Sequence, residues 1–451
     1  MTKRDGQLKL GAFLMYTGHH VAAWRHPGAS DGTRFSDFAH YARLAEDAKF
    51  DAVFLADGVN ARLNDVAAAS RKAHSGFYPF EPITLLSALA TVTSRIGLVA
   101  TASTTFSDPY NLARQFASLD HLSDGRAGWN LVTSADPGAA FNFSRDATVA
   151  HAERYKRAEE FIDVVTGLWD TTDDDAFLRD RHTGAYFDPQ KVRALDYRGA
   201  FFQVQGPLNI PRAPQGHPVV VQAGSSEPGK ELAARTAEVV FTAQQTLEGS
   251  VSFYRDLKGR LAKFGRSADD LKILPGVFPV VGKTRQEARN KFEQLQALLE
   301  PSVGLGMLAD LAGVDEVRNL PLDSLISDLP ETEGGKSRRA LFLELAAREN
   351  LTLRQLYERV AGARGHWQIV GTAEEIADEL EERFLNYGAD GFNVMSPALP
   401  WGLTDFIELV VPELRRRGLF RSEYQGSTLR EHLGLSRPYS GASLITPAAA
   451  E

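Results

Sequence analysis

Short runs of Val, Ile, Leu, Phe and Ala recur along the chain, and a segment with helical spacing of apolar residues follows each run. Runs that are apolar on both faces are typical of strands buried in a parallel sheet. In the segment 35–50, Phe38, Tyr41 and Ala45 fall on one helical face. The strand-like runs lie at 8–16, 51–58, 96–104, 127–134, 218–226, 238–246, 271–282 and 391–399. Strands that alternate with helices in this way predict an α/β fold.

Eight strand–helix units favour a (β/α)8 barrel, a TIM barrel, because no Gly-x-Gly-x-x-Gly of a doubly wound dinucleotide fold follows any strand. A minimal barrel needs about 250 residues, so about 200 of the 451 belong to insertions and a tail. We expect one domain with long insertions after strands four and seven, at about 171–217 and 301–366, and a C-terminal extension at about 419–451. A hairpin is expected at 198–210, and both insertions are expected to cover the barrel mouth as lids.

The fourth predicted strand ends in polar side chains, in the stretch HLSDGRAGWNLVTS at 121–134. Active sites of (β/α)8 barrels lie at the carboxyl ends of the strands. Polar residues at or just past predicted strand ends are Asp57, Ser103, Asn130, Thr133, Ser134, Gln222, Ser225, Ser226, Gln244 and Asn393. So many of them predict a polar ligand in the mouth.

His151 and Tyr155 share one face of the first turns of a predicted helix, because they are four residues apart. A helix N-terminus favours an anion such as a phosphate. The alternative is that His151 caps the helix and Tyr155 packs under the insertion. Ser225 and Ser226 place hydroxyl groups before the next helix, which suits an anion or an ordinary N-cap.

Three further positions have two readings each. Asp57 ends the second strand, where its carboxylate accepts a hydrogen bond from a ligand or caps the following segment. Trp24 follows the first strand, where it stacks on a ligand or packs in a lid. His19, His20 and His26 lack the carboxylate spacing of zinc helices, so we expect no metal site there and favour pocket or surface histidines.

Composition excludes several classes of function. The chain has 50 Lys and Arg against 58 Asp and Glu, a formal charge of −8 that argues against a nucleic-acid surface. It has no cysteine, which excludes disulfides, thiolate metal sites and a cysteine nucleophile. There is neither an apolar stretch near the ~18 residues of a spanning helix nor a signal-peptide pattern. We therefore expect a cytoplasmic protein that does not bind membranes.

Blocks of sequence from both ends of the chain resemble one enzyme family. They include AAWRHP at 22–27, KFDAVFLADG at 49–58, DHLSDGRAGWNLVTS at 120–134, PQGHPVVVQAGSSEPGKELAARTAEVVF at 214–241 and LFRSEYQGSTLREHLGL at 419–435. In order and content they resemble the bacterial-luciferase-like flavin-dependent monooxygenases. The resemblance is strongest to the branch of nitrilotriacetate monooxygenase, dibenzothiophene-sulfone monooxygenase and pristinamycin synthase.

The resemblance implies a barrel that uses O2 and FMN, with the flavin delivered as FMNH2 by a separate NAD(P)H:flavin reductase. It places His151, Tyr155 and Ser226 near the flavin phosphate, and Asp57, Ser103 and Asn130 nearer the ring. Ser225 is added to the residues expected near the phosphate, because it adjoins Ser226. The flavin carries the chemistry, so no acid or base residue is assigned. A homodimer or homotetramer is implied as well.

The family oxidises small organic substrates of several kinds, and cleavage of a C–S or C–N bond is our first expectation here. Candidate substrate contacts are His19, His20, Trp24 and Phe54, together with the lid at 301–366. Arg338 and Arg339 suit a carboxylate or sulfonate, or form a solvated basic pair. The alternatives are an F420-dependent oxidoreductase on the same barrel and a non-catalytic flavin-binding protein.

Overall fold

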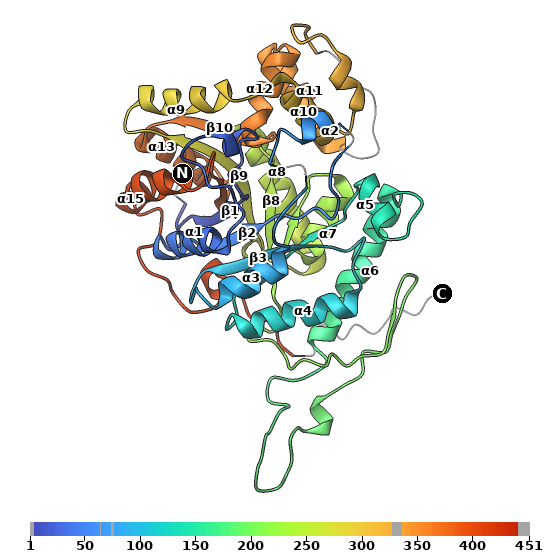
Figure 1. Ribbon diagram of the computed structural model, residues 1–451. Helices are drawn as coiled ribbons and strands as arrows, with labels where there is room; N and C mark the ends of the chain where they lie inside the picture. Colours follow the sequence, from blue (N-terminus) through green and yellow to red (C-terminus); the bar gives the residue numbers. More distant parts are fainter. Residues whose placement is uncertain (1–3, 64, 74–75, 327–335, 441–451) are drawn as a thin grey trace.

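Eight parallel strands form a closed barrel at the centre of the molecule (Figure 1). The structure, a computed structural model, describes residues 4–63, 65–73, 76–326 and 336–440. The barrel strands are β1 (Lys9–Leu14), β2 (Ala52–Leu55), β3 (Gly97–Ser103), β4 (Ala127–Val132), β7 (Val219–Ala223), β8 (Val239–Thr242), β9 (Lys272–Val281) and β11 (Gly391–Met395). They follow one another in this order around the barrel, and β11 pairs with β1 to close it. Each of the eight predicted runs contains one of them, so the predicted barrel is confirmed.

The barrel interior is filled by aromatic and branched side chains. The rings of Phe13, Phe54 and Phe241, from β1, β2 and β8, lie within 5.6 Å of one another between centroids. Val99, Val219 and other inward-facing aliphatic side chains complete this cluster. Because successive side chains of a strand alternate between its faces, the same strands place residues such as Trp129 against the helices outside.

Helices cover the outside of the barrel (Figure 1). The longer ones are α1 (Phe35–Asp47), α3 (Pro82–Ala90), α4 (Pro109–Leu122), α6 (His151–Trp169), α7 (Glu227–Thr236), α8 (Leu247–Arg260), α9 (Arg285–Ala297) and α13 (Ala373–Leu385). Shorter ones are α2 (Val66–Ala69), α5 (Pro137–Asn142), α14 (Trp401–Asp405) and α15 (Val411–Arg416), the last two joined by a π-helical turn at Phe406–Val410. Polar residues begin many of them: Asp108, for example, accepts hydrogen bonds from the amides of Tyr110 and Asn111 at the start of α4.

The first insertion does not form a lid. It follows α6, whose 19 residues span about 28 Å and return the chain to the amino end of the barrel before residue 171. There Arg212, near the end of the insertion, pairs with Asp170 at the end of α6. Residues 171–217 project from this end as a long arm, away from the mouth (Figure 1). The predicted hairpin is present, with β5 (Tyr197–Arg198) antiparallel to β6 (Gln203–Val204).

The second insertion forms a small helical unit with its own apolar core. It contains α10 (Pro301–Ala312), α11 (Lys336–Glu349) and α12 (Leu353–Ala363). The sequence pattern predicts one helix over 340–360, but the chain breaks between α11 and α12, where Asn350 has a left-handed φ of 52°. The polar stretch 329–339, LPETEGGKSRR, is predicted from its sequence to be a mobile loop, and most of it lies outside the described residues.

One strand was not predicted. β10 (Trp367–Gly371) pairs in parallel with Val277–Val281, the second half of the ten-residue β9. Val277 pairs with both β10 and β11, so these two strands lie on opposite edges of β9. Because β8 pairs with β9 only at Lys272–Pro275, the rest of the β8 edge of β9 is available to β10, which lies beside the closed barrel rather than in it.

Residues after 418 close the amino end of the barrel. α16 (Leu429–Leu433) inserts Leu429 and Leu433 into the interior cluster. A Cβ at Gly97 would lie 2.4 Å from Leu429 Cδ1, so the missing side chain of this glycine makes room for the leucine. Arg430 anchors the helix, because its Nη2 donates to Glu238 at 2.9 Å and its Nε donates to the carbonyl of His217 at 3.0 Å.

Replacing Leu429 by Ala should therefore leave a cavity at the base of the barrel. We expect the free energy of unfolding to fall by about 2–5 kcal/mol, as for other buried leucines. Urea denaturation followed by circular dichroism measures the change. The matched control is Leu122→Ala at a leucine that is 55% exposed, where little change is expected. Equal stability of the two variants would contradict the role of Leu429 in filling the amino end of the barrel.

Candidate functional site

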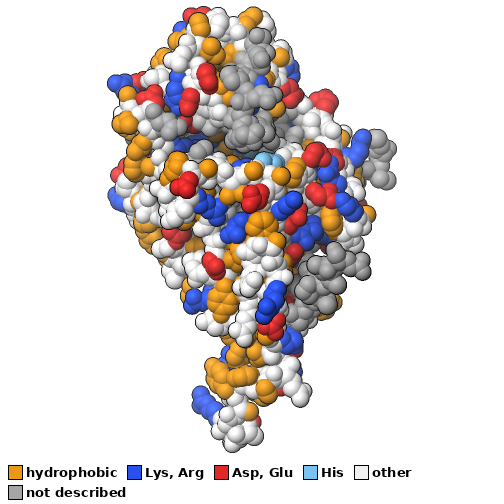
Figure 2. Space-filling view, turned by 90° about the vertical axis from the view of Figure 1, so that its right-hand side faces the viewer, with side chains coloured by type: hydrophobic (Ala, Val, Ile, Leu, Met, Phe, Trp, Pro, Cys, Tyr) orange, Lys and Arg blue, Asp and Glu red, His pale blue; other side chains and the backbone are white. Residues whose placement is uncertain are grey.

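A cavity of about 680 Å³ opens at the mouth of the barrel, between the ends of β4, β7 and β8, the start of α6 and helix α11. Its lining residues are Thr133, Ala135, His151, Arg154, Tyr155, Ala223, Gly224, Ser225, Ser226, Phe241, Thr242, Ala243, Gln244, Arg338, Ala340, Leu341, Glu344 and His366. Figure 2 shows the hollow in this face, with a histidine side chain visible at its edge. The volume lies within the range of about 300–1,000 Å³ that is usual for small-molecule sites.

Four of the predicted cofactor residues meet at this cavity. The hydroxyl of Tyr155 lies 3.2 Å from the Oγ of Ser226, and the ring of His151 lies 4.9 Å from the ring of Tyr155. Ser225 lines the cavity beside them. Ser226 is also the N-cap of α7, because its Oγ accepts a hydrogen bond from the amide of Gly229 at 3.3 Å. The N-cap reading of Ser226 is therefore confirmed, and its hydroxyl also faces the cavity.

The start of α6 is suited to an anion. His151 is the first residue of the helix and not its cap, and the N-cap residue, Ala150, provides no side-chain hydrogen bond. Backbone amides in the first turn of a helix lack intrahelical acceptors, and the helix dipole is positive at this end. The start of α7, capped by Ser226, lies across the Tyr155–Ser226 contact. Two helix N-termini thus adjoin the same group of hydroxyls.

Two glycines keep this corner of the cavity open. Gly224 has a φ of +151°, which L side chains rarely adopt. A Cβ at Gly229 would lie 3.0 Å from both the hydroxyl of Tyr155 and the Oγ of Ser226. A side chain at Gly229 would therefore crowd both hydroxyls.

Arg154 is a cavity residue that we did not predict. It is buried, and its Nη1 donates to the carbonyl of Val149 at 2.6 Å. It stands three residues after His151 and one before Tyr155, so helical periodicity places it on the same face. That spacing could have predicted a cationic side chain beside the residues expected to bind the phosphate.

Asp57 lies just after β2, and Ser103 and Asn130 lie on the neighbouring strands β3 and β4, but none of the three lines this cavity. Asp57 accepts a hydrogen bond from the amide of Gly58 at 2.8 Å, the capping contact expected as its alternative. Burial raises the pKa of the Asp57 carboxyl, and the negative charge of Glu81 adds to the effect. The Oγ of Ser103 accepts from the amide of Thr105 at 3.1 Å.

Asn130 belongs to a hydrogen-bonded chain across three strands. Its Nδ2 donates to the Oγ1 of Thr101 at 2.8 Å, and Thr101 donates to the carbonyl of Leu55 at 2.7 Å. The Oδ1 of Asn130 is buried, and no residue in the described ranges donates a hydrogen bond to it. An unpaired buried acceptor is costly, so this atom is suited to a ligand donor.

The predicted substrate contacts lie elsewhere. His19 Nε2 lies 3.0 Å from the carbonyl of Phe13, and His20 Nε2 lies 2.9 Å from Gln296 Oε1. Burial lowers the pKa of His19 to about 3 and that of His20 to about 4, so both imidazoles are neutral. Phe54 packs in the barrel interior. None of these three side chains lines the cavity.

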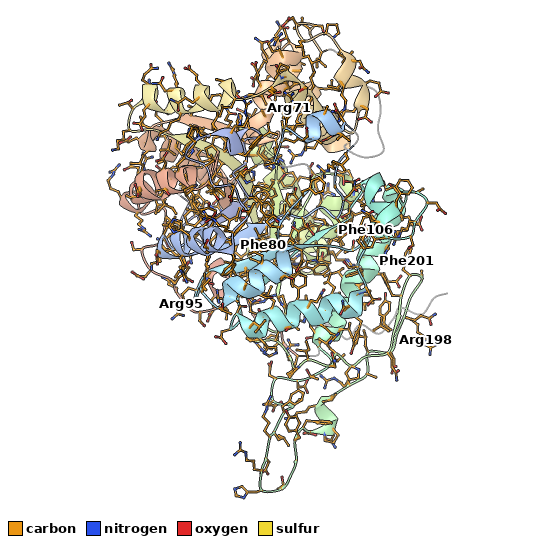
Figure 3. The ribbon with its side chains drawn as sticks, in the orientation of Figure 1. Arg71, Phe80, Arg95, Phe106, Arg198 and Phe201 are labelled. Atoms are coloured by element: carbon orange, nitrogen blue, oxygen red, sulfur yellow. The ribbon has the colours of Figure 1, made fainter. Side chains whose placement is uncertain are left out.

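Trp24, the fourth candidate, is 44% exposed and is not part of the cavity lining either. Its indole Nε1 donates to the backbone carbonyl of Arg71 at 3.2 Å. Arg71 is labelled in the upper part of Figure 3. The contact ties the turn after β1 to the segment after α2, which matches the expected packing alternative.

The polar strand ends only partly converge. Thr133, Ser225, Ser226 and Gln244 line the cavity. Gln222 points outward, because side chains alternate along β7, and its Nε2 lies 3.4 Å from the carbonyl of Gly229. Asn393 lies within β11 beside Gly11, in the lower part of the barrel.

Among the residues that the structure describes, there is neither a metal-binding cluster nor a membrane-spanning helix. Within these ranges, no group of three or more His, Asp or Glu side chains is arranged to hold a metal ion. None of the described helices is long and apolar enough to cross a membrane.

Known proteins resemble this chain over nearly its whole length. A model of the luciferase-like monooxygenase family matches residues 12–391. Nitrilotriacetate monooxygenase component A of Aminobacter aminovorans is 53% identical over 441 residues, which cover 96% of this chain and 97% of that protein. N-acetyl-S-(2-succino)cysteine monooxygenase of Bacillus subtilis (strain 168) is 50% identical over 443 residues, covering 97% and 99%.

A solved structure agrees with these relatives. Riboflavin lyase (RcaE), solved with modified FMN and its substrate riboflavin, matches with a TM-score of 0.84 and 32% identity, covering 96% of this chain and 97% of that one. One conclusion follows from the barrel, from the matched family model and from two relatives that are 53% and 50% identical to this chain. The chain belongs to the luciferase-like monooxygenase family.

Proposed function

We propose that the chain is the oxygenase of a two-component system, which takes FMNH2 from a separate NAD(P)H:flavin reductase and uses O2 to oxidise a small organic substrate at a C–S or C–N bond. The observation that carries the proposal is the meeting of His151, Tyr155, Ser225 and Ser226 at one cavity. The name of the Aminobacter aminovorans relative, component A, supports the two-component arrangement.

The phosphate of FMN is assigned to the starts of α6 and α7. Hydroxyls of Tyr155, Ser225 and Ser226 are suited to donate hydrogen bonds to it, and Arg154 supplies positive charge. Gly229 leaves these hydroxyls uncrowded. This donor set fits a phosphorylated flavin, and the modified FMN in the riboflavin lyase structure supports the same choice.

The flavin ring is assigned to the side of β2, β3 and β4. Asn130 Oδ1 would accept a hydrogen bond from a ring N–H, while its Nδ2 stays bound to Thr101. Asp57 and Ser103 follow on the next two strands of the same rim. A reduced flavin supplies the electrons that activate O2. The residues of the chain hold and orient it, and α11 helps to keep water from the cavity.

We further propose that the chain is one domain and associates as a homodimer or homotetramer. The single-domain reading is supported by α16, which closes the same barrel that begins at β1. Association is supported by exposed apolar side chains on the arm 171–217, where Leu178 is 51%, Tyr186 62% and Phe187 45% exposed. Figure 2 shows hydrophobic side chains gathered on the projecting arm. Such clusters often mark contact surfaces.

Replacing His151 by Ala should weaken binding of reduced FMN by about 10-fold or more, the loss expected for a hydrogen bond to a charged group. Anaerobic titration followed by flavin absorbance measures the dissociation constant. The matched control, His182→Ala, removes an exposed histidine on the arm and should leave the affinity unchanged. Equal affinity of the His151 variant and wild type would remove His151 from the phosphate site.

The reaction with oxygen tests the activity itself. The chain loaded with reduced FMN is mixed rapidly with O2 while the flavin spectrum is recorded. We expect a transient absorbance band that outlasts the oxidation of free reduced FMN. If the protein instead leaves FMN unaffected and binds reduced F420, the F420-dependent alternative replaces the proposal. If the protein binds reduced FMN but neither slows the oxidation of the flavin nor oxidises any substrate, the non-catalytic alternative replaces the proposal.

Association is measured by light scattering coupled to gel filtration. We expect a mass of two or four chains, and a smaller mass when Leu178, Tyr186 and Phe187 are all replaced by Ser. Retained secondary structure in the triple variant serves as the control for folding. A monomeric wild-type chain at micromolar concentration would contradict the proposed assembly.

A further inference from the structure

Arg338 and Arg364 are partly buried arginines near the barrel mouth, and their partners differ from those of the fully buried arginines elsewhere in the described ranges. Arg338, on α11, lines the cavity, and Arg364 follows α12 with a left-handed φ of 53°. Nη1 of Arg338 donates to the carbonyl of Arg364 at 2.8 Å, so the two residues are joined. Within the described ranges, neither guanidinium forms an ion pair with a carboxylate.

Elsewhere the buried guanidinium groups are compensated in one of two ways. Arg212, Arg421 and Arg430 pair with Asp170, Asp51 and Glu238. Arg126 and Arg383 each donate to several backbone carbonyls, and Arg383 also stacks on Trp367 at 3.5 Å. Burying an unpaired charge is costly. Arg338, which lines the cavity, and Arg364, whose carbonyl it binds, lack such compensation in the described ranges, and an anionic ligand would supply it.

The donors of both residues are largely unused. Arg338 donates to one carbonyl and to the Nε2 of His366 at 2.9 Å, which leaves three of its five N–H groups. The Nε of Arg364 is buried, and nothing in the described part of the chain accepts a hydrogen bond from it. Burial lowers the pKa of Arg338 to about 10, and the charge of Arg364 lowers it further in the same direction. Arg338 therefore stays cationic at neutral pH.

His366 holds Arg338 in place without adding charge. Its ring stacks on Phe241 at 4.7 Å with an interplanar angle of 17°, and a Cβ at Gly276 would lie 2.4 Å from its Nδ1. Burial, helped by the charge of Arg338, keeps the pKa of His366 well below its ordinary value. Because its Nε2 accepts from Arg338, the neutral ring carries its proton on Nδ1.

We infer that Arg338 and Arg364 bind carboxylate groups of the substrate, and that the enzyme acts on small polycarboxylates. Guanidinium groups recognise carboxylates through paired N–H donors. Two such groups on residues joined by a hydrogen bond favour a substrate with at least two carboxylates. The inference rests on the proposed function, because the phosphate of FMN is assigned to the starts of α6 and α7 and leaves these arginines for the substrate.

The names of the two relatives agree with this chemistry. Nitrilotriacetate carries three carboxylates, and so does N-acetyl-S-(2-succino)cysteine. The two molecules have a C–N and a C–S bond, respectively, close to those carboxylates. The two molecules therefore share their carboxylates and not the type of bond. Carboxylates are the feature that a pair of arginines recognises.

The test measures equilibrium binding by calorimetry, with the full-length chain and no turnover. The probes are nitrilotriacetate, N-acetyl-S-(2-succino)cysteine and the uncharged trimethyl ester of nitrilotriacetate. Wild type should bind at least one tricarboxylate and discriminate against the ester. Arg338→Met and Arg364→Met should each weaken tricarboxylate binding by about 10- to 100-fold, as expected when hydrogen bonds to a charged group are lost. Arg338→Lys should recover part of the loss.

Two controls separate this inference from its alternatives. Arg348 lies on the same helix, α11, and pairs with Glu349 at 3.0 Å. The Arg348→Met variant should bind tricarboxylates as wild type does. Reduced FMN should bind all four variants with unchanged affinity. Weakened FMN binding by the Arg338 and Arg364 variants would assign the pair to the flavin phosphate and overturn the inference.

The inference also fails if no tricarboxylate binds wild type or if the Met variants bind as wild type does. Failure of the proposed function would look different. Reduced FMN would then neither bind to the wild-type chain nor react with O2 in it, whatever the result of the tricarboxylate titrations.

Discussion

A parallel sheet becomes a barrel only when its last strand pairs with its first, and here Lys9–Phe13 of β1 pair with Gly391–Met395 of β11. All neighbouring strands of the barrel pair in parallel, so their carboxyl ends form one rim. Because β4, β7 and β8 are neighbours in this barrel, the start of α6, the loop after β7 and the ends of β4 and β8 meet at that rim. Tyr155 and Ser226, 71 residues apart in the sequence, come within 3.2 Å of each other because they follow the paired strands β4 and β7.

The sequence was informative wherever burial alone determined structure. Each barrel strand is apolar on both faces, so its position could be predicted. His151, Tyr155 and Ser226, named from the family resemblance, do meet at one cavity together with Ser225. The placement of residues 171–217 was wrong although the sequence held the answer. The predicted helix 151–170 already preceded the insertion and carried the chain away from the mouth.

Other features depend on partners that a sequence pattern does not reveal. β10 forms a strand because the second half of β9 extends beyond its contact with β8. His19 and His20 follow a barrel strand, as a ligand contact would, but both rings turn into packed surroundings where Phe13 and Gln296 bind them. The direction of a side chain in such a turn is set by tertiary packing. Arg154, by contrast, could have been found from its spacing to His151.

The closure of the barrel base by α16 has a consequence for how the chain is made. Leu429 and Leu433 cover the amino end of the interior, yet they are synthesised after every barrel strand. During translation the nearly complete barrel therefore exposes Val99, Val219 and their neighbours to water at one end. Exposed apolar surface in an incomplete fold promotes aggregation and recruits chaperones. The nascent barrel thus stays vulnerable until α16 leaves the ribosome.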